Sequence, residues 1–144
     1  FKSTLEEARY ADILIHIVDA SSPDMDMQMH VVYETLRELG AEGKPVVTLF
    51  NKQDLLAENG TQRDFRADYS IGTSARTGQG LDESRTALLG ILRRDQIYIE
   101  RLYSFDEAWK TQLIRSRGQL VSEEYLPEGI SIKAYVPGEI YGKV

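Results

Sequence analysis

Pro45-Val46-Val47-Thr48-Leu49-Phe50-Asn51-Lys52-Gln53-Asp54 is the stretch of this 144-residue sequence that decides its fold. Positions 45–50 are apolar almost throughout, which is typical of a parallel strand that is buried on both faces. The polar run Asn51–Asp54 follows directly. Because open α/β sheets bind ligands beyond the carboxyl ends of their strands, the sequence predicts a binding loop here.

A second polar loop follows the next predicted strand. Tyr69–Thr73 has the composition of a short strand, and Ser74-Ala75-Arg76 comes immediately after it. Neighbouring parallel strands end at the same edge of a sheet, so we expect the two loops to converge.

Together, the two loops suit recognition of a guanine base. The Asp54 carboxylate can accept hydrogen bonds from N1–H and the 2-amino group, and the backbone N–H of Ala75 can donate to O6. Adenine has no such donor pair, and a mismatch would leave buried polar groups unpaired. Asn51 would join the loops or reach N7, while the alkyl stems of Lys52 and Arg76 could cover the ring faces. The candidate site residues are Asn51, Lys52, Asp54, Ser74, Ala75 and Arg76.

Strands and helices alternate over the first two thirds of the chain, which predicts an α/β domain with a parallel sheet. We expect the strand Ile13–Val18 to be covered on both faces, because nearly every position in it is apolar. Leu81, Leu88 and Leu92 are expected to lie on one side of a helix. The other expected elements are a short helix from Ser3 to about Arg9, a helix over 22–39, and strands over 45–50 and 69–73.

After about Asp95 the pattern changes. A strand over 97–103 precedes a helix marked by Phe105, Ala108, Trp109 and Leu113, and a hairpin over 119–136 follows. In the second hairpin strand Ile130, Ile132, Ala134 and Val136 share one face. We therefore expect two domains, residues 1–95 and a small α+β (β-α-β-β) domain over 96–144.

Composition excludes several classes of protein. The formal net charge is −6 and the pI is about 5.0, which argues against binding nucleic acid through overall charge. No apolar run approaches the roughly 20 residues of a membrane span. The chain has no cysteine, which excludes disulfides and thiolate metal sites and fits a cytoplasmic protein.

The motifs Asn51–Asp54 and Ser74–Arg76 resemble the fourth and fifth guanine-nucleotide motifs of translation-associated P-loop GTPases. The segments Phe1–Ala8, Ala11–Ser21 and Val121–Ala134 are similar to the HflX-type GTPases, so the resemblance covers essentially the whole chain. It implies part of a P-loop GTPase domain followed by a small C-terminal domain. It also implies GTP or GDP as ligand, and a parent that binds the large ribosomal subunit and splits stalled ribosomes.

The sequence departs from the family pattern at the phosphate site. No G-x-x-x-x-G-K-[ST] motif occurs, and the switch segments that the resemblance implies would precede Phe1. We therefore expect a C-terminal fragment without catalytic residues or metal ligands. It should not hydrolyse GTP, and it should bind GTP or GDP weakly or not at all. Mg²⁺ would be held only in the intact parent.

The resemblance also bears on self-association. In the usual strand order of such domains, the strand that carries the P-loop lies beside Ile13–Val18. Its absence would leave an apolar strand at the edge of the sheet, and such an edge can pair with a second copy of the chain.

Other signals favour structural interpretations. Asp19 imitates a magnesium-binding aspartate, but it is expected to cap a loop or the next helix. His16 and His30 are too far apart in the sequence pattern to make a metal pair. The aromatic residues of the second domain could stack on bases, but we interpret them as its core; they are Tyr98, Tyr103, Phe105 and Trp109.

Alternatives remain open at this stage. Asn51–Asp54 could be a polar surface loop with a solvated lysine. The small domain could dock on a ribosomal or other protein, so that the chain acts as a non-enzymatic interaction module. A dinucleotide-binding domain is disfavoured because the sequence has no G-x-G-x-x-G motif.

Overall fold

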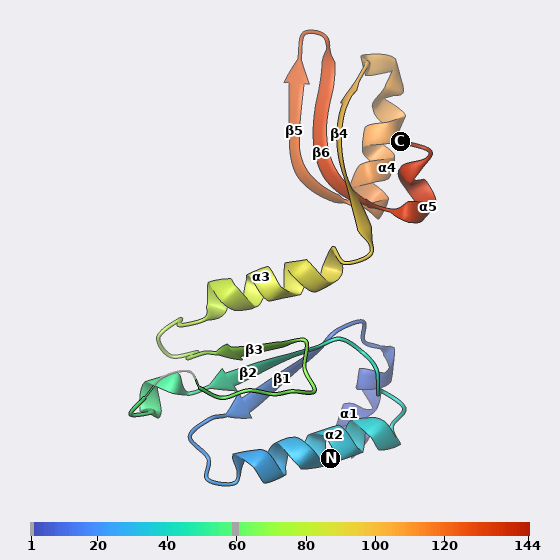
Figure 1. Ribbon diagram of the computed structural model, residues 1–144. Coiled ribbons are helices and arrows are strands. Elements are labelled where there is room, and N and C mark those ends of the chain that lie inside the picture. Colours follow the sequence, from blue (N-terminus) through green and yellow to red (C-terminus); the bar gives the residue numbers. More distant parts are fainter. Residues whose placement is uncertain (1, 59–60) are drawn as a thin grey trace. The chain divides into compact units, whose positions relative to one another are not determined.

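The computed structural model describes residues 2–58 and 61–144, which form two compact units, Phe1–Leu89 and Gly90–Val144 (Figure 1). Positions 1, 59 and 60 lie outside the described residues. The first belongs to the segment that resembles the GTPase family, and the other two follow the predicted loop Asn51–Asp54 in the sequence. The chain is α/β, as predicted, with one parallel and one antiparallel sheet.

The first unit is built on a parallel sheet with the strand order β1-β2-β3. The strands are β1 (Leu14–Asp19), β2 (Val46–Asn51) and β3 (Tyr69–Gly72). In the register of the first pair, Asp19 lies beside Asn51, and in the second pair Phe50 lies beside Gly72. The carboxyl ends of all three strands therefore meet at one edge of the sheet, as the sequence predicts.

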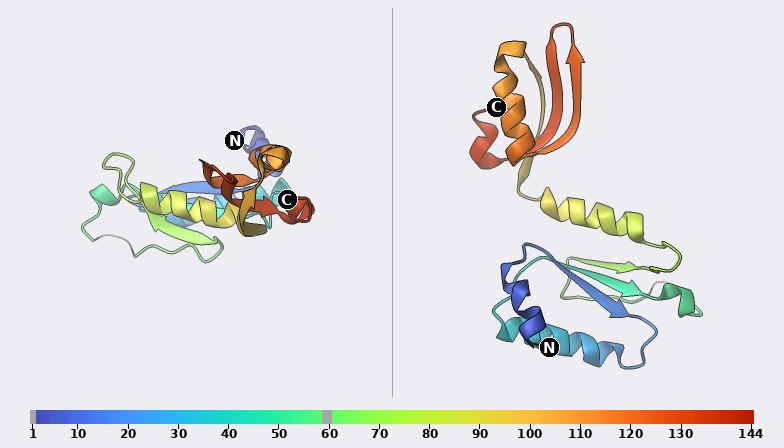
Figure 2. Two further views of the ribbon diagram at one scale, coloured as in Figure 1. Left: turned by 90° about the horizontal axis from the view of Figure 1, so that it is seen from above. Right: turned by 180° about the vertical axis from the view of Figure 1, so that it is seen from behind.

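Two helices lie on opposite faces of this sheet, α2 (Met25–Glu38) on one side and the first part of α3 (Leu81–Leu92) on the other (Figures 1 and 2). The chain begins with the short helices α1 (Lys2–Leu5) and η1 (Glu6–Tyr10). The predicted helix is present as α3, but the side that carries Leu81, Leu88 and Leu92 is not its buried side. Leu81 and Leu92 are exposed, and the buried side chains are Ser84, Ala87 and Ile91.

The core of the first unit lies around β2, whose side chains are buried at almost every position. The expectation that β1 is covered on both faces is wrong, because Ile15 is 50% exposed and Ile17 is 66% exposed. Val18, on the face toward α2, is buried. An apolar run shows that both faces can be buried, but it does not show that an element lies over each face.

The second unit is an antiparallel sheet with the strand order β4-β6-β5, packed on one face by two helices (Figure 1). The predicted hairpin is present. One face of β6 is fully buried against Ile114 of α4 and Ile140 of α5, and it carries Ile130, Ile132, Ala134 and Val136. The bounds are β4 (Gln96–Tyr103), η3 (Phe105–Glu107), α4 (Ala108–Arg117), β5 (Gln119–Leu126), β6 (Gly129–Pro137) and α5 (Gly138–Tyr141), the last of which was not expected.

The aromatic residues expected in the core of the second unit are mostly at its surface. Tyr103 is buried, but Tyr98, Phe105 and Trp109 are all exposed. The buried side of α4 is instead formed by Thr111 and Ile114. A short helix with few apolar residues fits more than one rotation, and its rotation is set by how its side chains fit the sheet.

Candidate functional site

The first loop of the candidate site begins where β2 ends. Asn51 is the last residue of β2, and the short helix η2 (Gln53–Leu55) starts two residues later. Lys52, between them, has a left-handed backbone with φ of 66°, the only positive φ of a non-glycine residue in the described ranges. Side chains disfavour this conformation, and residues held in it are concentrated at functional sites.

Gln53 anchors this loop from beneath. Its side chain is fully buried, and Nε2 donates hydrogen bonds to the carbonyl of Phe50 at 3.1 Å and to Oε1 of Gln62 at 3.0 Å. Its backbone N–H donates to the carbonyl of Thr73 at 3.0 Å. The sequence predicts no role for Gln53, because the pattern of apolar and polar positions shows no reason to bury a glutamine there.

The second loop is closed by its own backbone. The backbone N–H of Ser74 donates to the carbonyl of Gln79 at 3.0 Å, and the N–H of Gly78 donates to the carbonyl of Ser74 at 2.8 Å. Gly80 ends the loop with φ of 78°, and a Cβ atom there would lie 2.3 Å from the carbonyl oxygen of Gly72. Only glycine fits this close approach of two backbone segments.

Two side chains join the loops. Oδ1 of Asn51 accepts hydrogen bonds from the backbone N–H of Ala75 at 3.0 Å and from Oγ1 of Thr73 at 3.3 Å. The hydroxyl of Ser74, which is buried, donates to Oδ1 of Asp54 at 2.8 Å. The structure therefore brings the two predicted loops into direct contact, and it holds the Asp54 carboxylate in a fixed orientation.

A third strand end contributes a residue that sequence reasoning did not connect with the site. Oδ2 of Asp19 accepts a hydrogen bond from Nζ of Lys52 at 2.8 Å, while its Oδ1 accepts from the backbone N–H and the hydroxyl of Ser21. Asp19 thus caps its own loop, as expected, and also pairs with Lys52. These hydrogen bonds, first that from Lys52 and then those from Ser21, lower the pKa of Asp19 to about 2. One feature of the sequence could have linked Asp19 to the site: like Asn51, it is the polar residue that directly follows an apolar run, and the two residues are paired in the sheet.

A pocket of about 310 Å³ lies between the two loops, which is within the range of ligand sites in proteins. Five of the six candidate residues line it together with the exposed Leu55, and the sixth, Ser74, lies buried beneath Asp54. The lining residues are Asn51, Lys52, Asp54, Leu55, Ala75 and Arg76.

Two polar groups of this pocket could meet the edge of a ring, a carboxylate oxygen of Asp54 and the backbone N–H of Ala75. Oδ2 of Asp54 has no partner among the described residues, so it can accept hydrogen bonds from a ligand. The Ala75 N–H already donates to Asn51, so a ligand acceptor would share that hydrogen or displace Asn51. The arrangement suits a flat ring with donors on one edge and an acceptor beside them.

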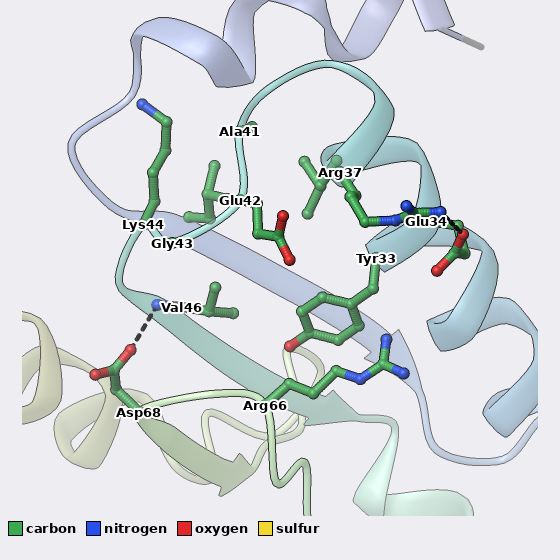
Figure 3. A pocket seen from close by; sticks show the side chains of 12 residues that line it. Tyr33, Glu34, Arg37, Ala41, Glu42, Gly43, Lys44, Val46, Arg66 and Asp68 are labelled. Atoms are coloured by element: carbon green, nitrogen blue, oxygen red, sulfur yellow. Dashed lines mark hydrogen bonds and ion pairs between the residues drawn. The ribbon is translucent and has the colours of Figure 1, made fainter.

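A larger cavity, of about 510 Å³, lies at the other end of the strands, where β1 and β2 begin (Figure 3). Its polar groups are largely engaged within the protein. Nζ of Lys44 donates to the carbonyls of Arg9 and Ala11 at 2.7 Å and 2.6 Å, and Arg37 pairs with Glu34. None of the six candidate residues lines this cavity.

Metal clusters and membrane-spanning helices are both absent from the described ranges. No group of three or more histidine, aspartate or glutamate side chains there is placed to hold a metal ion. Nor is any helix of those ranges long and apolar enough to cross a membrane.

A parallel sheet that ends in these two joined loops has the arrangement expected for part of a P-loop GTPase domain. The chain is homologous over its whole length to GTPases named HflX. It is 54% identical over 144 residues to the protein of that name from Lacrimispora saccharolytica, and 37% identical over 142 residues to the one from Caldanaerobacter subterraneus. These matches cover 100% and 97% of the chain.

A third relative, GTPase HflX from Akkermansia muciniphila, is 33% identical over 150 residues, again across 100% of this chain. The chain spans about one third of the length of these curated relatives, with shares of 34%, 32% and 34%. No family model matches the chain.

Proposed function

We propose that this chain forms the guanine-base-binding part of a GTPase. The observation that carries the proposal is the convergence of Asn51–Asp54 and Ser74–Arg76 around one pocket, in a chain homologous to proteins named as GTPases. The six candidate residues come from two loops separated in the sequence, and a structural role alone does not require an acceptor and a donor to face the same space.

The base would be read by hydrogen bonds along one edge. Asp54, held by Ser74 through Oδ1, offers Oδ2 to the N1–H and 2-amino donors of guanine. The Ala75 N–H, which donates to Asn51, would also donate a hydrogen bond to O6 of the base. Lys52 is held at its ammonium group by Asp19, so its alkyl stem is placed to cover one face of the ring, and the stem of Arg76 covers the other.

Hydrolysis would depend on parts outside these 144 residues. Phosphoryl transfer relies on a phosphate-binding loop and Mg²⁺, and the sequence contains no P-loop motif. We propose that this chain alone does not hydrolyse GTP and that a parent carrying the P-loop does. We also propose that the parent is a cytoplasmic GTPase that binds the large ribosomal subunit. This part of the proposal rests on the family resemblance.

The test is a comparison of purine nucleotides by ¹H–¹⁵N NMR. GMP is expected to shift the amides of Asn51 and Ala75, and AMP is not. In Asp54→Asn the order of affinity should change from GMP over XMP to XMP over GMP, because asparagine replaces an acceptor with a donor that matches the 2-oxo group of xanthine. We expect a loss of at least about tenfold for GMP, which corresponds to roughly 1.4 kcal/mol.

Asp12→Asn is the matched control, since it makes the same change at an exposed position that does not line the pocket. It should leave both affinities unchanged. Equal shifts with AMP and GMP at the two loops would contradict base recognition and favour the interaction module instead.

A further inference from the structure

A turn in the first unit displays a phenylalanine in an unusual way. Phe65 is 96% exposed, the highest exposure of any large apolar side chain in the described ranges. It lies between Asp64 and Arg66 in a turn that is closed by a hydrogen bond from the Ala67 N–H to the Asp64 carbonyl at 3.2 Å. Large apolar side chains that are displayed in this way commonly mark binding sites.

The turn is held rigidly by a buried carboxylate. Oδ2 of Asp64 accepts hydrogen bonds from the hydroxyl of Tyr33 on α2 and from Oγ1 of Thr48 on β2, the latter at 2.6 Å. Its Oδ1 accepts from the backbone N–H of Arg66 at 3.0 Å, and its own N–H donates to Oγ of Ser70 on β3 at 2.8 Å. The exposure of Phe65 is therefore fixed by three neighbouring elements and does not result from a loose loop.

A pocket of about 220 Å³ opens between this turn and α2. Its walls include the rings of Phe65, Tyr33 and His30 and the side chains of Arg63 and Arg66. This pocket and the base pocket between the two loops share no residue.

Two arginines and two aspartates line this second pocket, and the arginines are the groups there that can bind an anion. The Arg66 guanidinium lies 5.0 Å from the centre of the Tyr33 ring, which fixes its position, and Arg63 is exposed with no hydrogen bond or ion pair in the described ranges. Of the two carboxylates in the lining, Asp64 is buried and engaged by three donors, so Asp26 is the acidic group left exposed to a ligand.

We propose that this pocket is a second nucleotide site, in which a heterocyclic base stacks on Phe65 and a phosphate group pairs with Arg63 and Arg66. Aromatic rings and arginine side chains are the groups that bind unpaired bases and their phosphates. The same chemistry is offered by a free nucleotide and by one unit of a single-stranded nucleic acid, and the site does not depend on base recognition by Asp54.

The experiment titrates the 144-residue chain with UMP and with the octamer of uridylate, and follows amides by ¹H–¹⁵N NMR. Uracil lacks the donor edge that Asp54 is proposed to read, so the shifts should fall on Arg63–Ala67 and the first turns of α2. They should be absent from Asn51–Asp54 and Ser74–Arg76. If UMP causes these shifts and the octamer does not bind more tightly than UMP, the ligand is a free nucleotide. If the octamer binds more tightly than UMP, the ligand is a nucleic-acid strand.

Three variants separate stacking from other roles. Phe65→Leu keeps an apolar side chain without a π face and should weaken binding at least about fivefold, whereas Phe65→Trp should retain binding. Arg63→Gln should lower the slope of log affinity against log salt by about 0.7 for the octamer, the value for one lost phosphate contact on a single strand. Phe105→Leu, at an exposed phenylalanine of the second unit, is the control and should change nothing.

Shifts that fall elsewhere than on Arg63–Ala67 and the first turns of α2, or equal affinity of wild type and Phe65→Leu, would overturn the proposal. So would the absence of any response to either probe at low salt. Absence of any response to both probes would favour a protein partner that is anchored by Phe65.

Discussion

Oδ1 of Asn51 accepts a hydrogen bond from the backbone N–H of Ala75 at 3.0 Å, across 24 positions of the sequence. Together with the hydrogen bonds from Thr73 to Asn51 and from Ser74 to Asp54, this contact joins the loop after β2 to the loop after β3. The oxygen of the Asn51 amide serves two of these donors, so it contributes to the shape of the candidate base pocket.

Removing that oxygen should loosen the contact between the loops, although the hydrogen bond from Ser74 to Asp54 remains. Asn51→Ala is expected to lower the free energy of unfolding by about 1–2 kcal/mol, since two hydrogen bonds are lost at a partly buried position. Urea unfolding measures this change, and hydrogen exchange at the Ala75 amide should become faster. Asn51→Asp keeps an acceptor oxygen at the same place and should retain most of the protection at Ala75. Unchanged exchange in the alanine variant would show that Asn51 does not hold the loops.

The pair of Asp19 and Lys52 predicts a pH dependence in the acid range. The pKa of Asp19 is lowered to about 2 from an ordinary value of 3.8, so its ionised form is favoured in the folded state. The resulting stabilisation is complete above about pH 4 and is lost as the pH falls through 2. Lys52→Met removes the first of the hydrogen bonds that lower this pKa.

The measurement is an NMR titration of the Asp19 carboxyl together with unfolding at pH 5 and pH 2.5. In Lys52→Met the pKa of Asp19 should rise part of the way toward its ordinary value, since the hydrogen bonds from Ser21 remain. The stability difference between this variant and the wild type should shrink at the lower pH. A pKa that does not move would mean that the ion pair is not formed in solution.

The close approach at Gly80 predicts a large effect of a single methyl group. A Cβ atom there would lie 2.3 Å from the carbonyl oxygen of Gly72, so the backbone would have to move. Gly78 has a similar φ of 85° but open space around it, which makes Gly78→Ala a matched control. We expect about 1–2 kcal/mol of destabilisation for the control, from the left-handed backbone alone, and more for Gly80→Ala. Thermal unfolding of the two variants tests this, and equal losses would refute the steric argument.

The free edge of β1 predicts self-association. In the described sheet β1 pairs only with β2, and Ile15 and Ile17 are exposed beside the open edge. We expect a concentration-dependent dimer in analytical ultracentrifugation, because an apolar strand with unpaired backbone groups can add a strand from a second copy. Ile17→Lys should abolish it, and Met27→Lys, at an exposed position on α2, should not. A monomer at all concentrations would exclude this pairing.

The apolar and polar pattern was sufficient for the main elements. The three parallel strands, the helices α2 and α3 and the hairpin of the second unit lie close to where the sequence predicts them. The meeting of Asn51–Asp54 with Ser74–Arg76 could also be predicted, because parallel strands must end at a common edge. Both predictions rest on short-range periodicity and on a general rule of sheet topology.

The errors concern which side of an element is covered. Ile15 and Ile17 look as buried in the sequence as their neighbours, and Trp109 looks like a core residue of α4, yet all three are exposed. Apolar composition shows that a side chain can be buried favourably, but burial requires another element to lie over it.

By itself, the sequence determined the order of strands and helices, the position of both loops and the residue types that face the candidate base pocket, because these follow from local pattern and from chain connectivity. The tertiary structure alone decided that Gln53 is buried, that Asp19 holds Lys52, and that Asp64 fixes the turn beneath Phe65. Each of these contacts joins side chains from separate strands or loops, and their distances are set only when the whole unit packs.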